Sequence, residues 1–236
     1  MTRRCWIADE VSGDRAYLTG DHARHLAQVL RAKPGQEFDI STGSEVRQGK
    51  IVDIAADRVE FELGKALIAA THAEITVAIS IFKFDRMEWA IEKCTELGVT
   101  KVIPVIASRS EKHLASAALK RVERWRRVAK QASEQSRRLS VPKITDPIKL
   151  ADVLKVQSAA RIVLSEAEAE LSLKNALAEK LDSVFLAFGP EGGWKEDELA
   201  AFAKAGWISA SLGQTILRAE TAVIAAVAVC GSVLNS

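Results

Sequence analysis

A glycine-rich segment at residues 189–194, GPEGGW, follows the apolar run VFLAF and precedes the acidic sequence KEDELAAF. Glycines between a strand and a helix often bind phosphate, because bare backbone amides can approach the anion closely there. This segment has no lysine, and the carboxylate of Glu191 would repel phosphate. The pattern favours a neutral or cationic ligand, such as S-adenosylmethionine with its positive sulfonium, and a purely structural turn is an equal alternative.

Two further segments could contribute to the same site. SEAEAE (165–170) follows the apolar run RIVL, and LGQTILRAETA (212–222) overlaps the end of WISASL. From residue 75 onward, apolar runs alternate with segments of helical periodicity, which predicts βαβ units and a parallel sheet covered by helices. Ligands of such sheets bind at the carboxyl ends of the strands. We therefore expect these loops to meet at one edge of the sheet.

The amino-terminal part of the chain has a different pattern. Short strand-like runs (RAYLTG, QEFDIST, GKIVDIAAD and RVEFELG) are separated by glycine and proline, and one helix is predicted at residues 21–33, with Leu26, Val29 and Leu30 on one face. The pattern predicts a small β-barrel at residues 1–72 and an α/β domain at residues 73–236.

The charge of the chain is unevenly distributed. Its formal net charge is +2 over 236 residues, yet residues 108–143 hold eleven Lys and Arg against three Glu and carry a net +8. Within this segment a long helix is predicted at residues 114–139, with Leu119 and Trp125 in its apolar stripe. The concentration of positive charge indicates a polyanionic partner or, equally, a solvated helix face.

The composition also indicates the compartment of the protein and whether it binds a metal. The three cysteines are far apart and the histidines are accompanied by no other ligand cluster, which favours reduced thiols and no metal site. We find no signal peptide in the basic start MTRRCWIADEV, and no apolar run is long enough to span a bilayer. The chain is expected to be cytoplasmic.

Four motifs, in order along the chain, carry a family resemblance: KFDRMEWAIEKCTELGVTKVIPVIASRS, RWRRVAKQASEQSRRLSVP, FGPEGGWKEDEL and LGQTILRAETA. Together with the amino-terminal stretch HARHLAQVLRAKPG, they resemble the RsmE family of SPOUT-class methyltransferases over nearly the whole chain. The resemblance implies methylation of uracil N3 at position 1498, in the family's numbering of 16S ribosomal RNA. It also implies a trefoil-knotted α/β domain, a PUA-like RNA-binding barrel and a homodimer on the small ribosomal subunit.

The resemblance further implies S-adenosyl-L-methionine as the cofactor, in a pocket formed by three loops. Carried over residue by residue, the pocket consists of Leu164, Ser165, Glu166, Phe188, Gly189, Pro190, Glu191, Gly192, Gly193, Leu212, Gly213, Ile216, Leu217, Arg218 and Ala219.

Arg218 and Glu191 are the candidate catalytic residues. A cation such as Arg218 could stabilise the imide anion that develops at N3, or it could form a salt bridge with Glu191 or Glu220. Glu191 could orient cofactor groups, accept the proton, or cap the helix that follows. The favoured RNA contacts are Lys83, Arg86, Arg109, Arg137 and Arg138.

Three positions depart from the pattern of the resembled family. Phe84 and Arg137 stand where many relatives carry glycine, and Lys195 stands where a serine-like N-cap is frequent. The first two bear on the RNA substrate. Two other functions fit the same sequence: methylation of another RNA position by a SPOUT relative, and a non-catalytic RNA-binding assembly protein.

Overall fold

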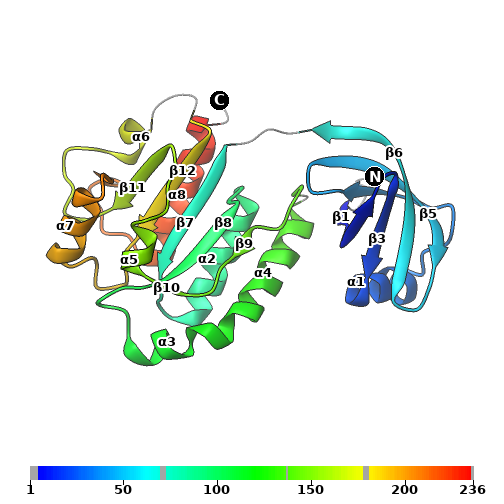
Figure 1. The fold of residues 1–236 in the computed structure, drawn as a ribbon, viewed down its shortest axis with the longest axis horizontal. Helices are drawn as coiled ribbons and strands as arrows, with labels where there is room; N and C mark the ends of the chain where they lie inside the picture. Colours follow the sequence, from blue (N-terminus) through cyan, green and yellow to red (C-terminus); the bar gives the residue numbers. More distant parts are fainter. Residues whose placement is uncertain (1–4, 70–72, 137, 178–180, 235–236) are drawn as a thin grey trace. The chain divides into compact units, whose positions relative to one another are not determined.

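The computed structural model describes residues 5–69, 73–136, 138–177 and 181–234 (Figure 1). The chain divides into two compact units. The N-terminal unit comprises Met1–Thr71 with Ser133–Val141, and the C-terminal unit comprises His72–Ala132 with Pro142–Ser236.

The N-terminal unit is built on one curled six-stranded sheet with the order β1-β4-β5-β6-β3-β2. All neighbouring pairs are antiparallel except β1 with β4. Its strands are β1 (Cys5–Ile7), β2 (Glu10–Ser12), β3 (Arg15–Thr19), β4 (Glu37–Ser41), β5 (Glu45–Ile54) and β6 (Arg58–Ala69). On β3 the side chains alternate, with Ala16 and Leu18 buried between more exposed neighbours, and these two residues belong to the core of the unit.

The amino-terminal helix is shorter and less regular than predicted. Helix α1 (Gly20–Arg24) continues as a π-helix at His25–Val29, whose turns hold more residues than α-helical turns. Side chains spaced for one face of an α-helix therefore no longer lie on one face after this segment. Leu26 is buried, but Val29 and Leu30 are 65% and 43% exposed, so the prediction of one shared apolar face for these three residues is wrong.

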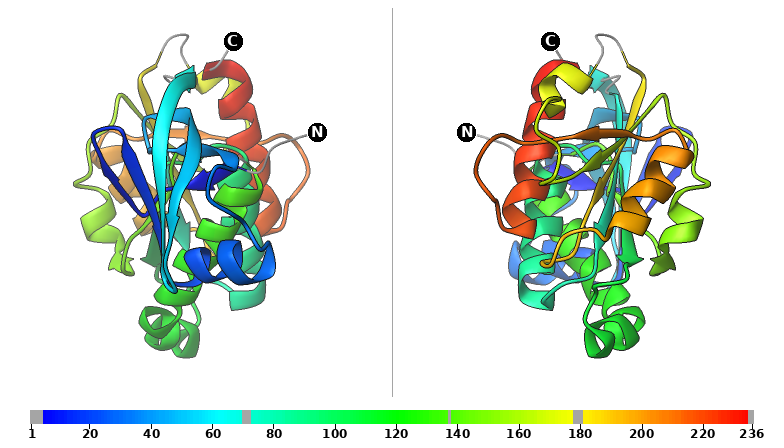
Figure 2. Two further views of the ribbon diagram at one scale, coloured as in Figure 1. Left: turned by 90° about the vertical axis from the view of Figure 1, so that its right-hand side faces the viewer. Right: turned by 90° about the vertical axis from the view of Figure 1, so that its left-hand side faces the viewer.

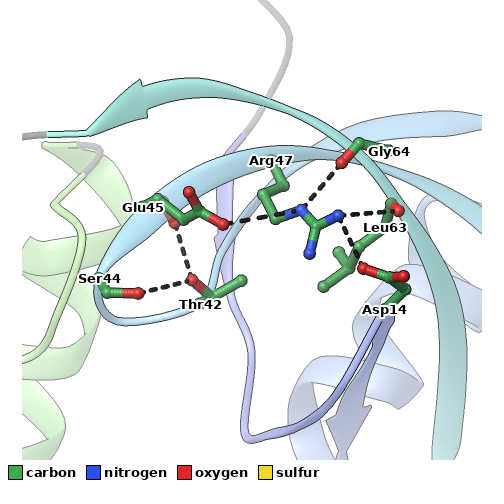
Figure 3. Close-up of polar contacts among 7 residues, drawn as sticks. All are labelled: Asp14, Thr42, Ser44, Glu45, Arg47, Leu63 and Gly64. Carbon is green, nitrogen blue, oxygen red and sulfur yellow. Dashed lines mark hydrogen bonds and ion pairs between the residues drawn. The ribbon is translucent and has the colours of Figure 1, made fainter.

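Arg47 on β5 stabilises an irregular part of this sheet (Figure 3). The pairing of β5 with β6 shifts register on both sides of Arg47. Its Nε donates to the Gly64 carbonyl at 2.8 Å, and its Nη2 donates to Asp14 Oδ1 at 2.9 Å and to the Leu63 carbonyl at 3.3 Å. The Glu45 carboxylate lies on the other side of the guanidinium, 3.7 Å from Nε. One side chain thus satisfies carbonyl groups at a β-bulge.

Replacing Arg47 with methionine should lower the free energy of unfolding by about 1–3 kcal/mol, because the exposed Gly64 carbonyl and the part-buried Leu63 carbonyl both lose a charged donor. Urea denaturation measures the change. The matched control is Arg24→Met, which removes an exposed i,i+3 pair with Asp21 and should cost less than about 0.5 kcal/mol. Equal losses in the two variants would show that Arg47 is only a surface ion pair.

The C-terminal unit contains a parallel sheet with the order β10-β8-β7-β12-β11-β13, and β9 pairs with β8 outside this path. All pairs are parallel. The strands are β7 (Glu74–Ser80), β8 (Lys101–Ile106), β9 (Lys143–Ile144), β10 (Ile148–Lys149), β11 (Ala160–Leu164), β12 (Ser183–Phe188) and β13 (Ile208–Ala210). The parallel α/β architecture predicted from the alternating pattern is confirmed.

Helices cover both faces of this sheet. They are α2 (Phe84–Glu96), α3 (Lys112–Ala117), α4 (Val122–Gln135), α5 (Leu150–Val153), α6 (Leu173–Ala176), α7 (Glu196–Lys204) and α8 (Ala219–Leu234). Figure 2 shows α8 (red) on one face and α7 (orange) on the other. On β12, Phe185 and Ala187 belong to the cluster on the α7 face together with Phe202, while the alternate residues Val184 and Leu186 are equally buried. Burial on both faces explains why this strand is an unbroken apolar run.

The long helix predicted at residues 114–139 is broken. A 3₁₀ turn at Ala118–Arg121 separates α3 from α4, and α4 ends at Gln135. A 3₁₀ turn has fewer residues per turn than an α-helix, so apolar residues before and after it do not follow one α-helical spacing. Ala118 and Trp125 are fully buried, whereas Leu119 is 62% exposed and does not belong to the stripe. None of the helices in the described ranges is long and apolar enough to span a bilayer.

Candidate functional site

A cavity of about 690 Å³ lies at the carboxyl ends of β11, β12 and β13. These strands are neighbours or next neighbours in the sheet, so the loops that follow them meet at one edge. All fifteen residues assigned to the pocket from the sequence line this cavity: Leu164, Ser165, Glu166, Phe188, Gly189, Pro190, Glu191, Gly192, Gly193, Leu212, Gly213, Ile216, Leu217, Arg218 and Ala219.

The sequence did not single out Trp194 as part of this wall. Its indole Nε1 donates to the Leu164 carbonyl at 3.1 Å, and the side chain is 9% exposed. The bond connects the GPEGGW loop to the end of β11. The feature of the sequence that could have identified Trp194 is its position directly after the glycines of the turn. The other residues lining the cavity outside the assigned set are Arg86, Arg109, Ala167, Leu199, Ser211, Gln214, Thr215 and Ala222.

The GPEGGW loop has a tight backbone that two of its glycines make possible. Gly193 has φ +68° and donates from its amide to the Pro190 carbonyl at 2.8 Å. A Cβ on Gly189 would lie 3.3 Å from the Trp194 amide nitrogen. The loop therefore folds back on itself and presents backbone atoms to the cavity, which explains the choice of glycine better than phosphate binding does.

Residues that follow β8 form hydrogen bonds to the GPEGGW loop and to the start of α7. Arg109 Nη1 donates to the Gly192 carbonyl at 2.6 Å and to the Trp194 carbonyl at 3.3 Å. The buried carboxylate of Glu198 accepts from the Ser108 amide through Oε1 and from the Lys195 amide through Oε2, each at 2.9 Å. Glu198 is thus the carboxylate that caps α7, a role that the sequence had left open for Glu191.

Glu191 is engaged by an arginine from another helix. Arg86 on α2 donates from Nη1 to Glu191 Oε1 at 2.8 Å, and its Nε lies 3.7 Å from Glu220 Oε1 at the start of α8. The sequence had offered Arg218 as the partner of these two carboxylates. Arg218 is exposed, lines the cavity and forms no ion pair with a described residue.

The five candidate RNA contacts lie in different surroundings. Arg86 and Arg109 are in the cavity wall, and Lys83 is exposed at the residue before α2. Arg138 is half-buried, and burial lowers the pKa of its guanidinium. Arg137 lies outside the described residues.

The loop after β11 is ordered by its own carboxylate. Glu168 Oε1 accepts from the amides of Glu170 at 3.0 Å and Leu171 at 3.2 Å, and these hydrogen bonds lower the pKa of Glu168. The hydrogen bonds favour the ionised form of Glu168. The stability that they contribute is therefore fully present above the pKa that Glu168 has in the unfolded chain, and it is lost as the pH falls through the lower pKa of the folded protein.

Acidification should therefore loosen this loop in parallel with protonation of Glu168. The protection factors of the Glu170 and Leu171 amides, each the intrinsic exchange rate divided by the observed rate, should fall toward the acidic end of the titration, because a protonated carboxyl is a weaker acceptor. NMR-detected exchange across the acidic range measures them, after correction for the pH dependence of intrinsic amide exchange. In Glu168→Gln the protection factors should already be low at neutral pH. Protection factors that stay independent of pH in the unaltered chain would contradict the assignment.

The cavity combines apolar walls, backbone groups and a few charged side chains. Leu164, Phe188 and Leu217 supply apolar surface, and the glycines expose amides and carbonyls. Within the part of the chain that the structure describes, no group of three His, Cys, Asp or Glu is arranged to hold a metal ion. The arrangement suits an organic ligand with both apolar and hydrogen-bonding groups.

Comparison with known proteins defines the class. The profile of the RNA methyltransferase domain matches residues 69–231, and that of the RNA methyltransferase PUA domain matches residues 18–64. A crystal structure of ribosomal RNA small subunit methyltransferase E from Neisseria gonorrhoeae, bound to S-adenosyl methionine, has a TM-score of 0.85 at 29% identity and covers 99% of this chain and 98% of its own. The fold is that of a SPOUT methyltransferase with a PUA-like amino-terminal domain.

Curated relatives give the particular family. The chain is 33% identical to ribosomal RNA small subunit methyltransferase E of Rickettsia conorii, over 89% of this chain and 87% of that protein. It is 31% identical to the protein of the same name from Bacillus subtilis, over 87% of this chain and 85% of that protein. The chain belongs to the ribosomal RNA small subunit methyltransferase E family.

Proposed function

We propose that this protein transfers a methyl group from S-adenosyl-L-methionine to N3 of one uridine of 16S ribosomal RNA, at position 1498 in the family's numbering. The observation that supports this most strongly is the cavity, which all fifteen assigned residues line. The relatives are named for the small ribosomal subunit, and the Neisseria gonorrhoeae structure holds the cofactor.

The residues of the cavity fit this cofactor. A volume of about 690 Å³ lies within the range of small-molecule sites, roughly 300–1,000 Å³. The glycine backbone of the GPEGGW loop offers hydrogen-bonding groups for an adenine edge, and Glu191 suits a positively charged sulfonium. When bound, the cofactor supplies an electrophilic methyl group; the chain supplies orientation and charge.

Two side chains carry the catalytic part of the proposal. N3 lies on the Watson–Crick edge, so the uracil must leave any base pair before it reaches the cavity. Arg218, exposed on the cavity wall, would stabilise the imide anion that forms as N3 loses its proton. Glu191 engages Arg86 through Oε1, and we assign Oε2 as the acceptor of that proton.

The remaining parts of the proposal concern partners. The N-terminal unit, whose sequence matches the PUA profile, would bind RNA together with the basic segment at residues 108–143. We also propose a homodimer in the cytoplasm and a knotted threading of the carboxyl-terminal loops, as the family resemblance implies.

The test combines binding with mapping of the product. Calorimetry of the purified protein with S-adenosylmethionine should show binding, and labelled cofactor should then mark one uridine of small subunits that lack the modification. Label on a different nucleotide, or on transfer RNA, would favour a SPOUT methyltransferase of another specificity. Absence of cofactor binding by the folded protein would refute the enzymatic proposal and favour a non-catalytic role as an RNA-binding assembly protein.

A further inference from the structure

The guanidinium of Arg86 joins three separate elements at the wall of the cavity. Arg86 belongs to α2, Glu191 to the GPEGGW loop and Glu220 to the first turn of α8. Its Nη1 is 2.8 Å from Glu191 Oε1 and its Nε is 3.7 Å from Glu220 Oε1. Segments more than 100 positions apart in the sequence are therefore connected through one side chain.

Glu220 is the buried end of this cluster. Its side chain is 6% exposed, and its Oε2 has no hydrogen-bond partner among the described residues. A buried carboxylate is costly unless a cation compensates it, and in the described chain Arg86 is the cation that forms its ion pair. Arg86 is consequently anchored from the protein interior, while its other edge reaches the half-exposed Glu191.

The charge balance of the cluster opposes RNA phosphate. Two carboxylates surround one guanidinium, so the three groups together carry a net charge of −1 in their ionised forms. A phosphate that approached Arg86 would have to displace a carboxylate or accept repulsion from it. Lys83 lies three positions earlier, is exposed and forms no ion pair with a described residue, and so it suits a phosphate contact better.

We propose that Arg86 is a positioning residue: anchored on the buried Glu220, it holds the Glu191 carboxylate in place on the GPEGGW loop, and it does not contact RNA. This inference deepens the proposed function and rests on it where cofactor binding is concerned. It also explains why the carboxylate that begins the last helix is buried beside the cavity. Arg218 is thereby left available for the substrate.

Replacing Arg86 with glutamine tests this role in three measurements. The dissociation constant for S-adenosylmethionine, measured by calorimetry, should rise about tenfold, the equivalent of one charge-assisted hydrogen bond. The Arg86→Lys variant should recover part of that loss, because lysine keeps the charge but cannot reach both carboxylates with a planar fork. Adding Glu191→Gln to Arg86→Gln should cost little more, since Arg86 acts through Glu191.

The salt dependence of RNA binding separates positioning from phosphate contact. With unmodified small-subunit ribosomal RNA as the probe, Arg86→Gln should leave the slope of log affinity against log salt unchanged. Lys83→Gln should reduce that slope by about 0.7–0.9, the value of one phosphate contact. A reduced slope in Arg86→Gln, with cofactor affinity within twofold of the unaltered protein, would overturn the proposal.

Two further measurements distinguish the positioning role of Arg86 from a general loss of stability. Arg86→Gln leaves Glu220 buried without its cation, so the double variant Arg86→Gln with Glu220→Gln removes both charges and should restore thermal stability while the cofactor affinity stays low. Without any ligand, amide exchange at Gly192 and Gly193 should rise in Arg86→Gln and stay unchanged in the exposed control Lys155→Gln. Failure of the unaltered protein to bind cofactor would refute the proposed function alone; unchanged exchange at the loop would refute the role of Arg86.

Discussion

The Arg218→Gln variant is expected to lose about 100-fold or more in kcat while its affinity for S-adenosylmethionine changes less than about threefold. Removing one preorganised donor that faces a developing anion typically costs this much. Arg218 is exposed on the cavity wall, and the ion pairs of Glu191 and Glu220 are made by Arg86. Loss of the Arg218 side chain should therefore slow methyl transfer to the base and leave the structure of the GPEGGW loop intact.

Single-turnover transfer of labelled methyl groups to unmodified small subunits measures the effect on the chemical step, and calorimetry measures cofactor binding. Lys155→Gln, which removes an exposed i,i+3 pair with Asp152 on α5, is the control for a lost surface charge and should leave both quantities unchanged. A variant with full kcat but tenfold weaker cofactor binding would assign Arg218 to the cofactor and not to the transition state.

The Gly189→Val variant is expected to weaken cofactor binding by at least about tenfold. A Cβ at this position would lie 3.3 Å from the Trp194 amide nitrogen and 3.4 Å from the Gly193 carbonyl carbon. Both neighbours are backbone atoms, so the loop itself would have to move, and overpacking of this kind costs about 1–3 kcal/mol. The bond from Trp194 to the Leu164 carbonyl should weaken with it.

Calorimetry with S-adenosylmethionine and the thermal midpoint distinguish a displaced loop from general unfolding. Gly231→Ala is the matched control: a Cβ there has its nearest neighbour, the Leu97 carbonyl oxygen, at 4.0 Å, and the residue lies in α8. This change should leave cofactor affinity unaltered and should not lower stability, because alanine is the better helix former. Cofactor affinity retained in Gly189→Val would show that the loop adapts.

Local sequence pattern was sufficient for the α/β architecture. The apolar runs VFLAF and RIVL became β12 and β11 because buried parallel strands need apolar side chains on both faces. The basic helical segment was predicted as one helix, yet the chain forms α3, a 3₁₀ turn and α4. No glycine or proline marks that break, so local propensity could not reveal it.

The sequence by itself determined which loops could form the site: three segments after apolar runs, with their glycines, Arg218 and Glu191. It could do so because strand ends of a parallel sheet meet at one edge whatever the details of packing. Only the tertiary structure decided how the charges pair. Arg86 reaches Glu191 across 105 positions and Arg109 reaches Gly192 across 83, while Glu198 takes the capping role. Such partners depend on which helices pack beside the sheet edge, and spacing along the chain does not encode that.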